Sequence, residues 1–181
     1  IEQGSIQRLG QVDMAVLTFG SPGSYNVASV GDTKKVKHNN PIYVAGFSIN
    51  NPQVLRHETG VVVAYAEVGI DQGYQLLYDN ETESGMSGGV LLNADGQLIG
   101  LHGRGEKDEQ ASRRELIIKT GVNQGIPITY YKLFASGAPV VIANTTATTA
   151  DDYIAQAQAS QRKKGREQTV IRLANKALSI R

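Results

Sequence analysis

A serine enclosed by glycines is the part of this sequence whose residue types and spacing best suit covalent chemistry. The segment ESGMSGG occupies residues 83–89, and the apolar run VLL follows at residues 90–92. Glycines allow left-handed backbone turns, and such turns point N–H groups into a concave site that can bind an oxyanion. A base that removes the hydroxyl proton would make Ser87 a nucleophile. The alternative is a glycine-rich hairpin turn with an incidental serine, because short motifs recur by chance.

The same residues also fit G-x-S-x-G, the nucleophile elbow of α/β-hydrolases, which needs a strand before the serine and a helix after it. Here the run at residues 90–92 is followed by the turn NADG at residues 93–96 and by a second apolar run at residues 97–101. Two apolar runs separated by a glycine-containing turn are typical of a β-hairpin. Because no helix follows the serine, the elbow interpretation is rejected.

The other groups that could take part in such chemistry are an acid and three imidazoles. Asp13 lies at the head of an alternating apolar segment, residues 12–19, which predicts a strand. An aspartate in that position is usually a turn or capping residue, so a catalytic role depends on what lies near it. His38 and His57 lie in polar segments that we expect to be loops, and His102 follows the hairpin.

Short apolar runs separated by regular turn signals predict that these residues are carried by an antiparallel β-barrel. Further strands are expected at residues 42–47, 59–68, 74–78 and 115–119, with a turn at residues 50–52 and one short helix at residues 129–135. The predicted body spans residues 1–136.

After the body, the sequence predicts a linker at residues 137–150 and a helical pair at residues 151–181. The segment TADD at residues 149–152 resembles a capping box, and Gly165 is a helix stop. The second helix is expected to bury one apolar face, formed by Val170, Leu173, Ala174, Ala177 and Leu178.

Composition excludes several kinds of site. With 181 residues the chain can build a core, and the absence of cysteine excludes disulfides and thiolate metal sites. The sequence indicates no metal and no cofactor. It has no transmembrane run and begins at an isoleucine, as a processed or truncated start would. Localisation stays unassigned, with a periplasmic or secreted protein as the favoured interpretation.

The net charge of +1 hides an asymmetry between body and tail. From Ser160 onward seven basic residues stand against one acid, whereas the rest of the chain carries eleven basic and sixteen acidic residues. A basic tail can bind nucleic acid or an acidic partner, but a charge run is more often the solvated face of a helix. We therefore expect a protein partner for the tail, and neither nucleic acid nor membrane as a partner.

Four motifs, in order, resemble those of the trypsin/chymotrypsin-like serine peptidase superfamily. They are VDMAVL at residues 12–17, GMSGG at 85–89, IGLHG at 99–103 and KTGV at 119–122, which are similar to the aspartate-bearing strand, the nucleophile loop, the substrate-lining strand and the pocket-closing strand. More narrowly, the chain resembles cyanobacterial trypsin-like peptidases that are joined to tetratricopeptide repeats, and residues 151–181 resemble one such repeat. The resemblance implies a mostly β fold of chymotrypsin-like antiparallel barrels, the first incomplete, with a C-terminal α-helical hairpin.

The resemblance also implies roles for single residues. Ser87 is the expected nucleophile, Asp13 orients the general base, and the N–H groups of Ser87 and Gly85 bind the oxyanion. The expected substrate is a polypeptide. Its implied binding positions are Glu81, Thr82, His102, Gly103, Arg104 and Gly121.

The sequence departs from the family at the general base. The family's histidine precedes the aspartate, but no histidine occurs among the twelve residues before Asp13. The first strands of the N-terminal barrel are missing too, and Met86 replaces the acid that pairs with a newly cut N-terminus in zymogen-activated members. Three hypotheses follow: a serine endopeptidase whose histidine lies outside this chain, with a second chain or fragment completing the barrel; a catalytically inactive peptide-binding module; or an adaptor that acts through its helical tail.

The residues near the expected pocket give conflicting predictions of which bond is cut. Thr82 and His102 have the spacing seen in glutamyl endopeptidases, where a threonine and a histidine bind the P1 carboxylate. Both can donate to an anion, which favours an acidic or polar P1 residue. Glu81 favours Lys or Arg instead. Alternatively, His102 is a core histidine that bonds a backbone carbonyl, and Arg104 either strengthens the preference for an acid or faces solvent.

Overall fold

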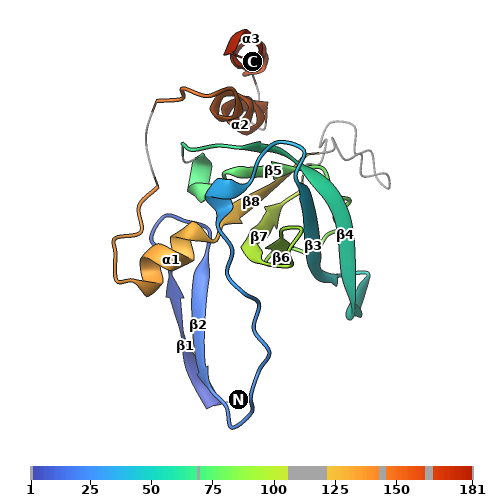
Figure 1. The fold of residues 1–181 in the computed structure, drawn as a ribbon, viewed down its shortest axis with the longest axis vertical. Helices are drawn as coiled ribbons and strands as arrows, with labels where there is room; N and C mark the ends of the chain where they lie inside the picture. Colours follow the sequence, from blue (N-terminus) through green and yellow to red (C-terminus); the bar gives the residue numbers. More distant parts are fainter. Residues whose placement is uncertain (1, 69, 106–121, 143–145, 162–164, 181) are drawn as a thin grey trace.

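Antiparallel strands closed into a barrel form the centre of the molecule (Figure 1). The computed structural model describes residues 2–68, 70–105, 122–142, 146–161 and 165–180. The strands run in the order β3-β4-β5-β8-β7-β6, with every neighbouring pair antiparallel. Their bounds are β3 Pro41–Ser48, β4 Asn51–Tyr65, β5 Leu76–Tyr78, β6 Val90–Leu92, β7 Leu98–Arg104 and β8 Asn123–Pro127. The predicted mostly β fold with an antiparallel barrel is confirmed.

The barrel interior is apolar because its strands alternate between an inner and an outer face. On β3, for example, Ile42 and Val44 are fully buried, whereas Tyr43 between them is 38% exposed. The interior cluster consists of Val36, Ile42, Val44, Val62, Leu76, Tyr78, Met86, Leu91 and Ile99. Met86 directly precedes Ser87, so a completely buried side chain anchors the nucleophile loop. Burial of one such side chain is worth about 1.5–3 kcal/mol.

A two-stranded sheet, β1 Glu2–Arg8 and β2 Ala15–Gly20, lies outside the barrel. Ile6 lies opposite Leu17 in the register, and Phe19 shares the face of Leu17 because it is two residues further along the strand. These three side chains are 74%, 59% and 41% exposed. Among the described residues, β1 and β2 are the only strands outside the closed barrel. The first barrel is therefore incomplete in the described residues, as predicted.

The connection between β1 and β2 folds back against the barrel and positions Asp13. Leu9, Val12 and Met14 are buried in a cluster that includes Tyr74. The N–H of Leu9 donates to the carbonyl oxygen of Met14 at 3.0 Å, which closes a turn. The strand predicted from residue 12 therefore begins at residue 15, because alternating burial at 12–14 belongs to this turn.

Two predicted boundaries around β4 and β5 are wrong. The expected turn at residues 50–52 lies instead at residues 49–50, since β4 already begins at Asn51 and pairs with β3. His57 consequently lies in a strand rather than a loop. The strand expected from Tyr74 begins at Leu76, because the short helix η2, Asp71–Gly73, precedes it. The strand expected at residues 115–119 lies outside the described residues.

Three α-helices follow the barrel: α1 Thr129–Ala135, α2 Ala150–Gln161 and α3 Glu167–Ile180. They match the predicted short helix and helical pair. α2 lies against β4, and α3 packs on α2 (Figure 1). The predicted capping box is present, because Thr149 Oγ1 accepts the N–H of Asp152 at 3.1 Å and Asp152 Oδ2 accepts the N–H of Thr149 at 2.9 Å. None of the helices that the structure describes is long and apolar enough to cross a membrane.

The apolar face predicted for α3 is correct in part. Leu173 and Ala177 are buried, one helical turn apart, and Val170 and Ala174 are half-buried. The prediction for Leu178 is wrong, because this side chain is 71% exposed. It lies one residue beyond Ala177 and therefore about 100° further round the helix, away from α2.

Candidate active site

The loop that carries Ser87 connects β5 to β6 and is bonded to β7. The Ser87 hydroxyl is exposed and donates to the carbonyl oxygen of Gly103 at 2.9 Å. The N–H of Gly88 donates to the carbonyl oxygen of His102 at 2.7 Å, and the N–H of His102 donates to that of Gly89 at 2.8 Å. These bonds fix the serine at the end of the strand that the sequence predicted to line the substrate.

The other side of the loop lies against the turn between β3 and β4. The N–H of Ile49 donates to the carbonyl oxygen of Ser84 at 2.9 Å. Gly85 has a φ of +99°, a backbone conformation that favours glycine. A Cβ at this position would also lie 2.5 Å from the Ile49 nitrogen, so glycine is required for both backbone conformation and space. Within the described residues the N–H groups of Gly85 and Ser87 have no hydrogen-bond acceptor. These two N–H groups are the ones that the resemblance assigns to the oxyanion.

Asp13 is held by the turn that leads into β5. Its N–H donates to the carbonyl oxygen of Gln72 at 3.0 Å, and its Oδ2 accepts the hydroxyl of Tyr74 at 2.5 Å. Tyr74 is only 1% exposed. Burial raises the pKa of Tyr74, and the hydrogen bond to Asp13 raises it further. The hydroxyl therefore stays protonated and acts as the donor.

Gly103 connects the serine to the aspartate. Its carbonyl oxygen accepts the Ser87 hydroxyl, and a Cβ at this position would lie 2.3 Å from the Tyr74 hydroxyl oxygen. Ser87, Gly103, Tyr74 and Asp13 thus form one continuous series of contacts. The nucleophile loop and the turn that carries Asp13 are therefore linked through Gly103 and Tyr74.

Arg104 belongs to this site but does not point freely into solvent. Its guanidinium carbon lies 4.0 Å from the centroid of the Tyr74 ring, a cation–π contact. The same group reaches Asp71 Oδ2 at 3.4 Å and also hydrogen bonds Gln72 Oε1. Its charge is therefore shared with the η2 turn.

Thr82 and His102 are both buried, at 3% exposure each. The Thr82 hydroxyl donates to Asn123 Oδ1 at 2.8 Å. The His102 ring lies beside Tyr78, with Nδ1 2.5 Å from the tyrosine hydroxyl. Burial raises the pKa of Tyr78 well above its ordinary value, so its hydroxyl stays protonated and can donate to Nδ1 of the Nε2–H tautomer or accept from Nδ1–H of the other. In the first of these neutral tautomers the imidazole proton is on Nε2, which makes this nitrogen a donor.

This geometry tests the alternative that His102 is a core histidine bonded to a backbone carbonyl. The ring is in the core, as that alternative required, but the partner of its Nδ1 is a tyrosine hydroxyl and not a backbone carbonyl. Glu81 is exposed. Gly121 and most of the pocket-closing segment lie outside the described residues.

The two other histidines make no contact with the proposed catalytic groups. His38 is exposed, and its Nδ1 lies 2.9 Å from the carbonyl oxygen of Val63. His57 is exposed on β4. The part of the chain that the structure describes thus places no imidazole against both Asp13 and Ser87. It also holds no cluster of three or more His, Cys, Asp or Glu side chains suited to a metal.

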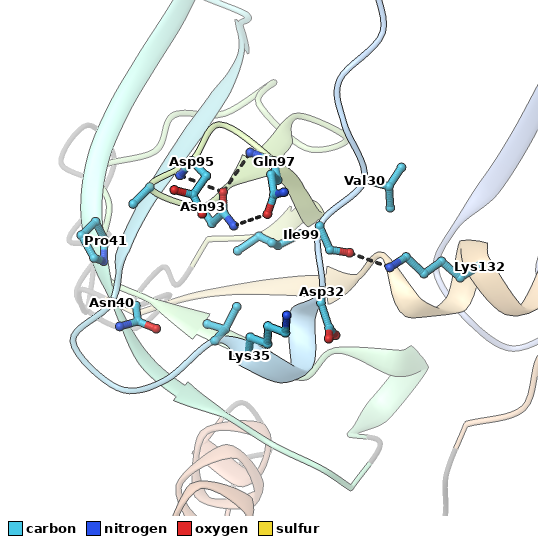
Figure 2. A pocket seen from close by; sticks show the side chains of 13 residues that line it. Val30, Asp32, Lys35, Asn40, Pro41, Asn93, Asp95, Gln97, Ile99 and Lys132 are labelled. Atoms are coloured by element: carbon cyan, nitrogen blue, oxygen red, sulfur yellow. Dashed lines mark hydrogen bonds between the residues drawn. The ribbon is translucent and has the colours of Figure 1, made fainter.

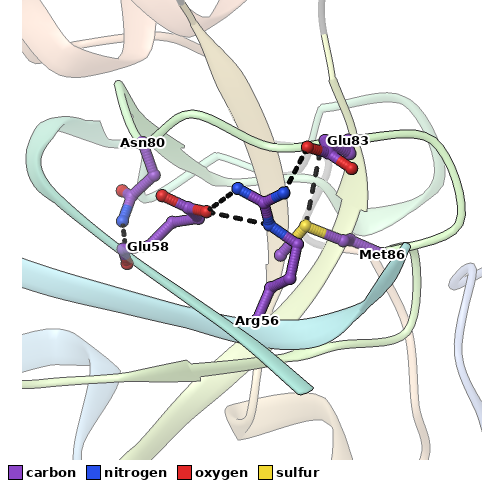
Figure 3. Close-up of polar contacts among 5 residues, drawn as sticks. All are labelled: Arg56, Glu58, Asn80, Glu83 and Met86. Atoms are coloured by element: carbon purple, nitrogen blue, oxygen red, sulfur yellow. Dashed lines mark hydrogen bonds and ion pairs between the residues drawn. The ribbon is translucent and has the colours of Figure 1, made fainter. Parts of the chain in front are cut away.

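Sequence reasoning missed two residues of the site, Tyr74 and Arg56. Arg56 on β4 pairs with Glu58 and with Glu83, which lies in the nucleophile loop (Figure 3). Tyr74 was assigned only to a strand. Neither residue belongs to a motif, and both contacts join segments far apart in the chain, so no local signal could have revealed them.

A cavity of about 570 Å³ opens elsewhere on the barrel, beside the short helix η1, Thr33–Lys35 (Figure 2). Its lining carries Asp32, Lys35, Asp95 and Lys132, and Lys132 Nζ donates to the carbonyl oxygen of Gly31 at 2.7 Å. None of the predicted site residues lines it. The cavity is therefore separate from the site around Ser87.

Comparisons with known proteins agree with this fold. A family model described as a trypsin-like peptidase domain matches residues 2–101, which include both Asp13 and Ser87. No curated protein matches the sequence. Among solved structures, an HtrA-type protease (AlgW) with a decapeptide is similar in fold, with a TM-score of 0.55 and 16% sequence identity. The match covers 74% of this chain and 40% of that protein's chain.

Proposed function

The chain belongs to the trypsin-like peptidase domain family, and from this premise we propose that it carries the nucleophile of a serine endopeptidase. Ser87 Oγ attacks the carbonyl carbon of the scissile bond while a histidine takes its proton. The same histidine then gives that proton to the leaving amine, which leaves an acyl-enzyme that water hydrolyses. The histidine comes from a segment outside this chain, or from a second polypeptide.

The residues of this chain have distinct parts in that reaction. Asp13 orients the histidine and stabilises its charged form. The N–H groups of Gly85 and Ser87 donate to the oxyanion, where preorganised donors are worth about 10²–10³ in rate each. The Ser87 hydroxyl must turn away from the carbonyl oxygen of Gly103 when the base arrives, because one proton cannot serve both acceptors.

One observation carries the proposal: the continuous contact from Ser87 through Gly103 and Tyr74 to Asp13. A glycine-rich turn with an incidental serine would not be expected to connect, through Gly103 and Tyr74, to a carboxylate held by a buried donor. Asp13 and Ser87 are far apart in the chain, and a shared catalytic role accounts for both motifs at once.

A fluorophosphonate probe tests the proposal. We expect intact-mass spectrometry to detect one adduct, absent in Ser87→Ala. A longer form of the protein that includes a histidine-bearing segment should label at least about a hundredfold faster than this chain alone, because that is the usual contribution of a general base. Labelling that persists in Ser87→Ala would refute the assignment.

The positions of the histidines favour a second candidate, a catalytically inactive module that binds peptides without cutting them. His38 and His102 hydrogen bond other groups, and His57 is exposed on β4, so the described residues hold no histidine against both Ser87 and Asp13. The two candidates differ in the longer protein. A module of the second kind retains a labelled peptide intact, whereas the peptidase converts it into two fragments.

For the cleaved bond we propose an acidic or polar P1 residue. The support is chemical: His102 is a buried imidazole on β7 beside the nucleophile loop, and in the tautomer whose Nδ1 accepts the Tyr78 hydroxyl its Nε2 is a donor. The Thr82 hydroxyl already donates to Asn123 Oδ1, so His102 is the proposed donor to the P1 side chain. Glu81, which would favour Lys or Arg, is exposed and contributes to the electrostatic environment of Arg56.

Two protein partners are also proposed. The first is a second chain or fragment that covers the apolar face of β1 and β2, because Ile6, Leu17 and Phe19 are otherwise exposed. The second contacts the helical tail, where Ile171 and Leu178 are 60% and 71% exposed and share a face seven residues apart. A scaffold role for the barrel, with the tail as an adaptor, is the weaker alternative.

A further inference from the structure

The hydroxyl of Tyr74 hydrogen bonds Asp13 directly. The proposed reaction assigns roles to Ser87, Asp13 and Gly85, and none to Tyr74. The oxygen–oxygen distance is 2.5 Å, within the range of strong hydrogen bonds to a carboxylate. Asp13 is exposed, whereas Tyr74 is 1% exposed. A buried, rigid donor thus holds a carboxylate that would otherwise be free to rotate at the surface.

The position of the Tyr74 ring is fixed from several sides. Apolar neighbours bury it, among them Val12 and Met14, which flank Asp13 in the chain. Arg104 stacks on the ring face, with its guanidinium carbon 4.0 Å from the ring centroid. The ring therefore moves little relative to the backbone of Asp13.

Gly103 provides the space that the hydroxyl needs. A Cβ at residue 103 would lie 2.3 Å from the hydroxyl oxygen and 2.5 Å from Cε1 of the ring, so any larger residue would displace Tyr74. The carbonyl oxygen of the same glycine accepts the Ser87 hydroxyl. One residue thus makes room for the donor to Asp13 and also contacts the nucleophile.

We propose that Tyr74 is a positioning residue, which fixes Asp13 Oδ2 by hydrogen bonding so that the other carboxylate oxygen is oriented toward the imidazole of the general base. The inference rests on the proposed function. Tyr74 contacts neither the substrate nor the reacting atoms; it acts through Asp13. Small displacements of a catalytic group carry large costs, since a misplacement of about 1 Å lowers a rate by about a hundredfold.

The test compares Tyr74→Phe with Tyr130→Phe in a form of the protein that shows Ser87-dependent turnover. Tyr130 is a matched control, because it is 4% exposed in the same buried cluster, whereas the hydroxyl that donates to Asp13 is that of Tyr74. We expect Tyr74→Phe to lower kcat by about ten- to a hundredfold and to change KM less than twofold. Tyr130→Phe should change neither.

A second readout does not depend on activity. In proton NMR spectra of this chain, a buried hydroxyl bonded to a carboxylate should give a slowly exchanging, downfield resonance. That signal should vanish in Tyr74→Phe and in Asp13→Asn and should persist in Tyr130→Phe.

The outcomes separate the two proposals. Turnover that is abolished by Ser87→Ala but unchanged by Tyr74→Phe overturns the positioning role and leaves the peptidase function intact. Equal losses in Tyr74→Phe and Tyr130→Phe, or a loss confined to KM, also overturn it. If no form of the protein shows Ser87-dependent turnover, the proposed function fails, and a persisting NMR signal then gives the Tyr74–Asp13 contact a structural role only.

Discussion

The guanidinium of Arg56 forms an ion pair of 2.5 Å with the carboxylate of Glu83, four residues before Ser87 (Figure 3). Arg56 also pairs with Glu58 on its own strand at 2.6 Å. The N–H of Glu83 lies 3.3 Å from the sulfur of Met86, whose side chain is fully buried. Arg56 on a barrel strand and the buried side chain of Met86 therefore hold the nucleophile loop together. Residue 86 is a methionine here, whereas the resemblance puts an acid at this position in zymogen-activated members, where it pairs with the newly cut N-terminus.

The first prediction concerns this ion pair. Arg56→Met should loosen the loop, because Glu58 and Glu83 would then face each other without a cation between them. We expect faster amide exchange in residues 83–88 by mass spectrometry, and acylation of Ser87 slowed several-fold. Global stability should change by no more than about 1 kcal/mol, because both side chains are partly exposed.

A double-mutant cycle provides the control for the Arg56 prediction. Arg56→Met combined with Glu83→Gln should be no worse than Arg56→Met alone, since the two residues share one interaction. Arg56→Lys should restore part of the protection, and Arg172→Met on α3 should leave the loop unaffected. Unchanged amide exchange in residues 83–88 of Arg56→Met would contradict the role of the ion pair in holding the loop.

The second prediction concerns P1 preference. In a peptide library, the active form should prefer Glu or a polar residue at P1, and His102→Ala should lower the Glu-to-Gln ratio of kcat/KM by about tenfold, the effect of losing one charge-assisted hydrogen bond. His57→Ala, on the exposed side of β4, is the control and should leave the ratio unchanged. A clear preference for Lys or Arg that survives His102→Ala would end this proposal.

The third prediction concerns the docking of α2. Asp152 is fully buried and accepts the N–H groups of Glu67 and Val68 at 2.9 and 3.2 Å. Burial by itself would raise its pKa, but hydrogen bonds from Thr149, Thr148 and Val68 lower it below the ordinary value of 3.8. A lowered folded-state pKa means that Asp152 stabilises the fold above about pH 4, and that this contribution is lost as the pH falls further.

Asp152→Asn should therefore lower the free energy of unfolding at pH 7 by about 1–3 kcal/mol, measured by urea denaturation. The difference from the parent protein should shrink as the pH is lowered below 4. Glu167→Gln is the control, because this acid in the first turn of α3 is exposed, and we expect a change within about 0.5 kcal/mol. An Asn variant as stable as the parent at pH 7 would refute the role of the buried carboxylate.

The fourth prediction concerns the exposed sheet of β1 and β2. The chain alone should associate through this face, with sedimentation velocity showing a concentration-dependent dimer or larger species. Replacing Ile6 and Leu17 by threonine keeps the strand preference while removing apolar surface, and should shift the species to monomer. Val54→Thr, at the exposed end of β4, is the control. A parent chain that stays monomeric, unfolds cooperatively and resists proteolysis would count against the predicted partner.

The sequence by itself determined the type of fold and singled out Ser87 as the candidate nucleophile. Alternating apolar runs and turn residues recur at short range, and the physical reason for each is local, so they predict a barrel and a serine loop without knowledge of distant contacts. The glycines around Ser87 carried the same information, because left-handed φ angles need glycine wherever the loop lies. Strand limits were less reliable: β2 and β5 begin later than predicted because turns with partly buried residues precede them.

Tertiary structure decided which groups support the site. Tyr74 lies 61 residues from Asp13 in the chain, and Arg56 lies 27 residues from Glu83. Tyrosine and arginine occur in many strands, and neither position carried a motif. The partner of His102 was unpredictable for the same reason, since a hydroxyl on a neighbouring strand and a backbone carbonyl satisfy an imidazole equally well. Such pairings follow from how the barrel closes and which strands become neighbours, a property of the whole chain that no local pattern encodes.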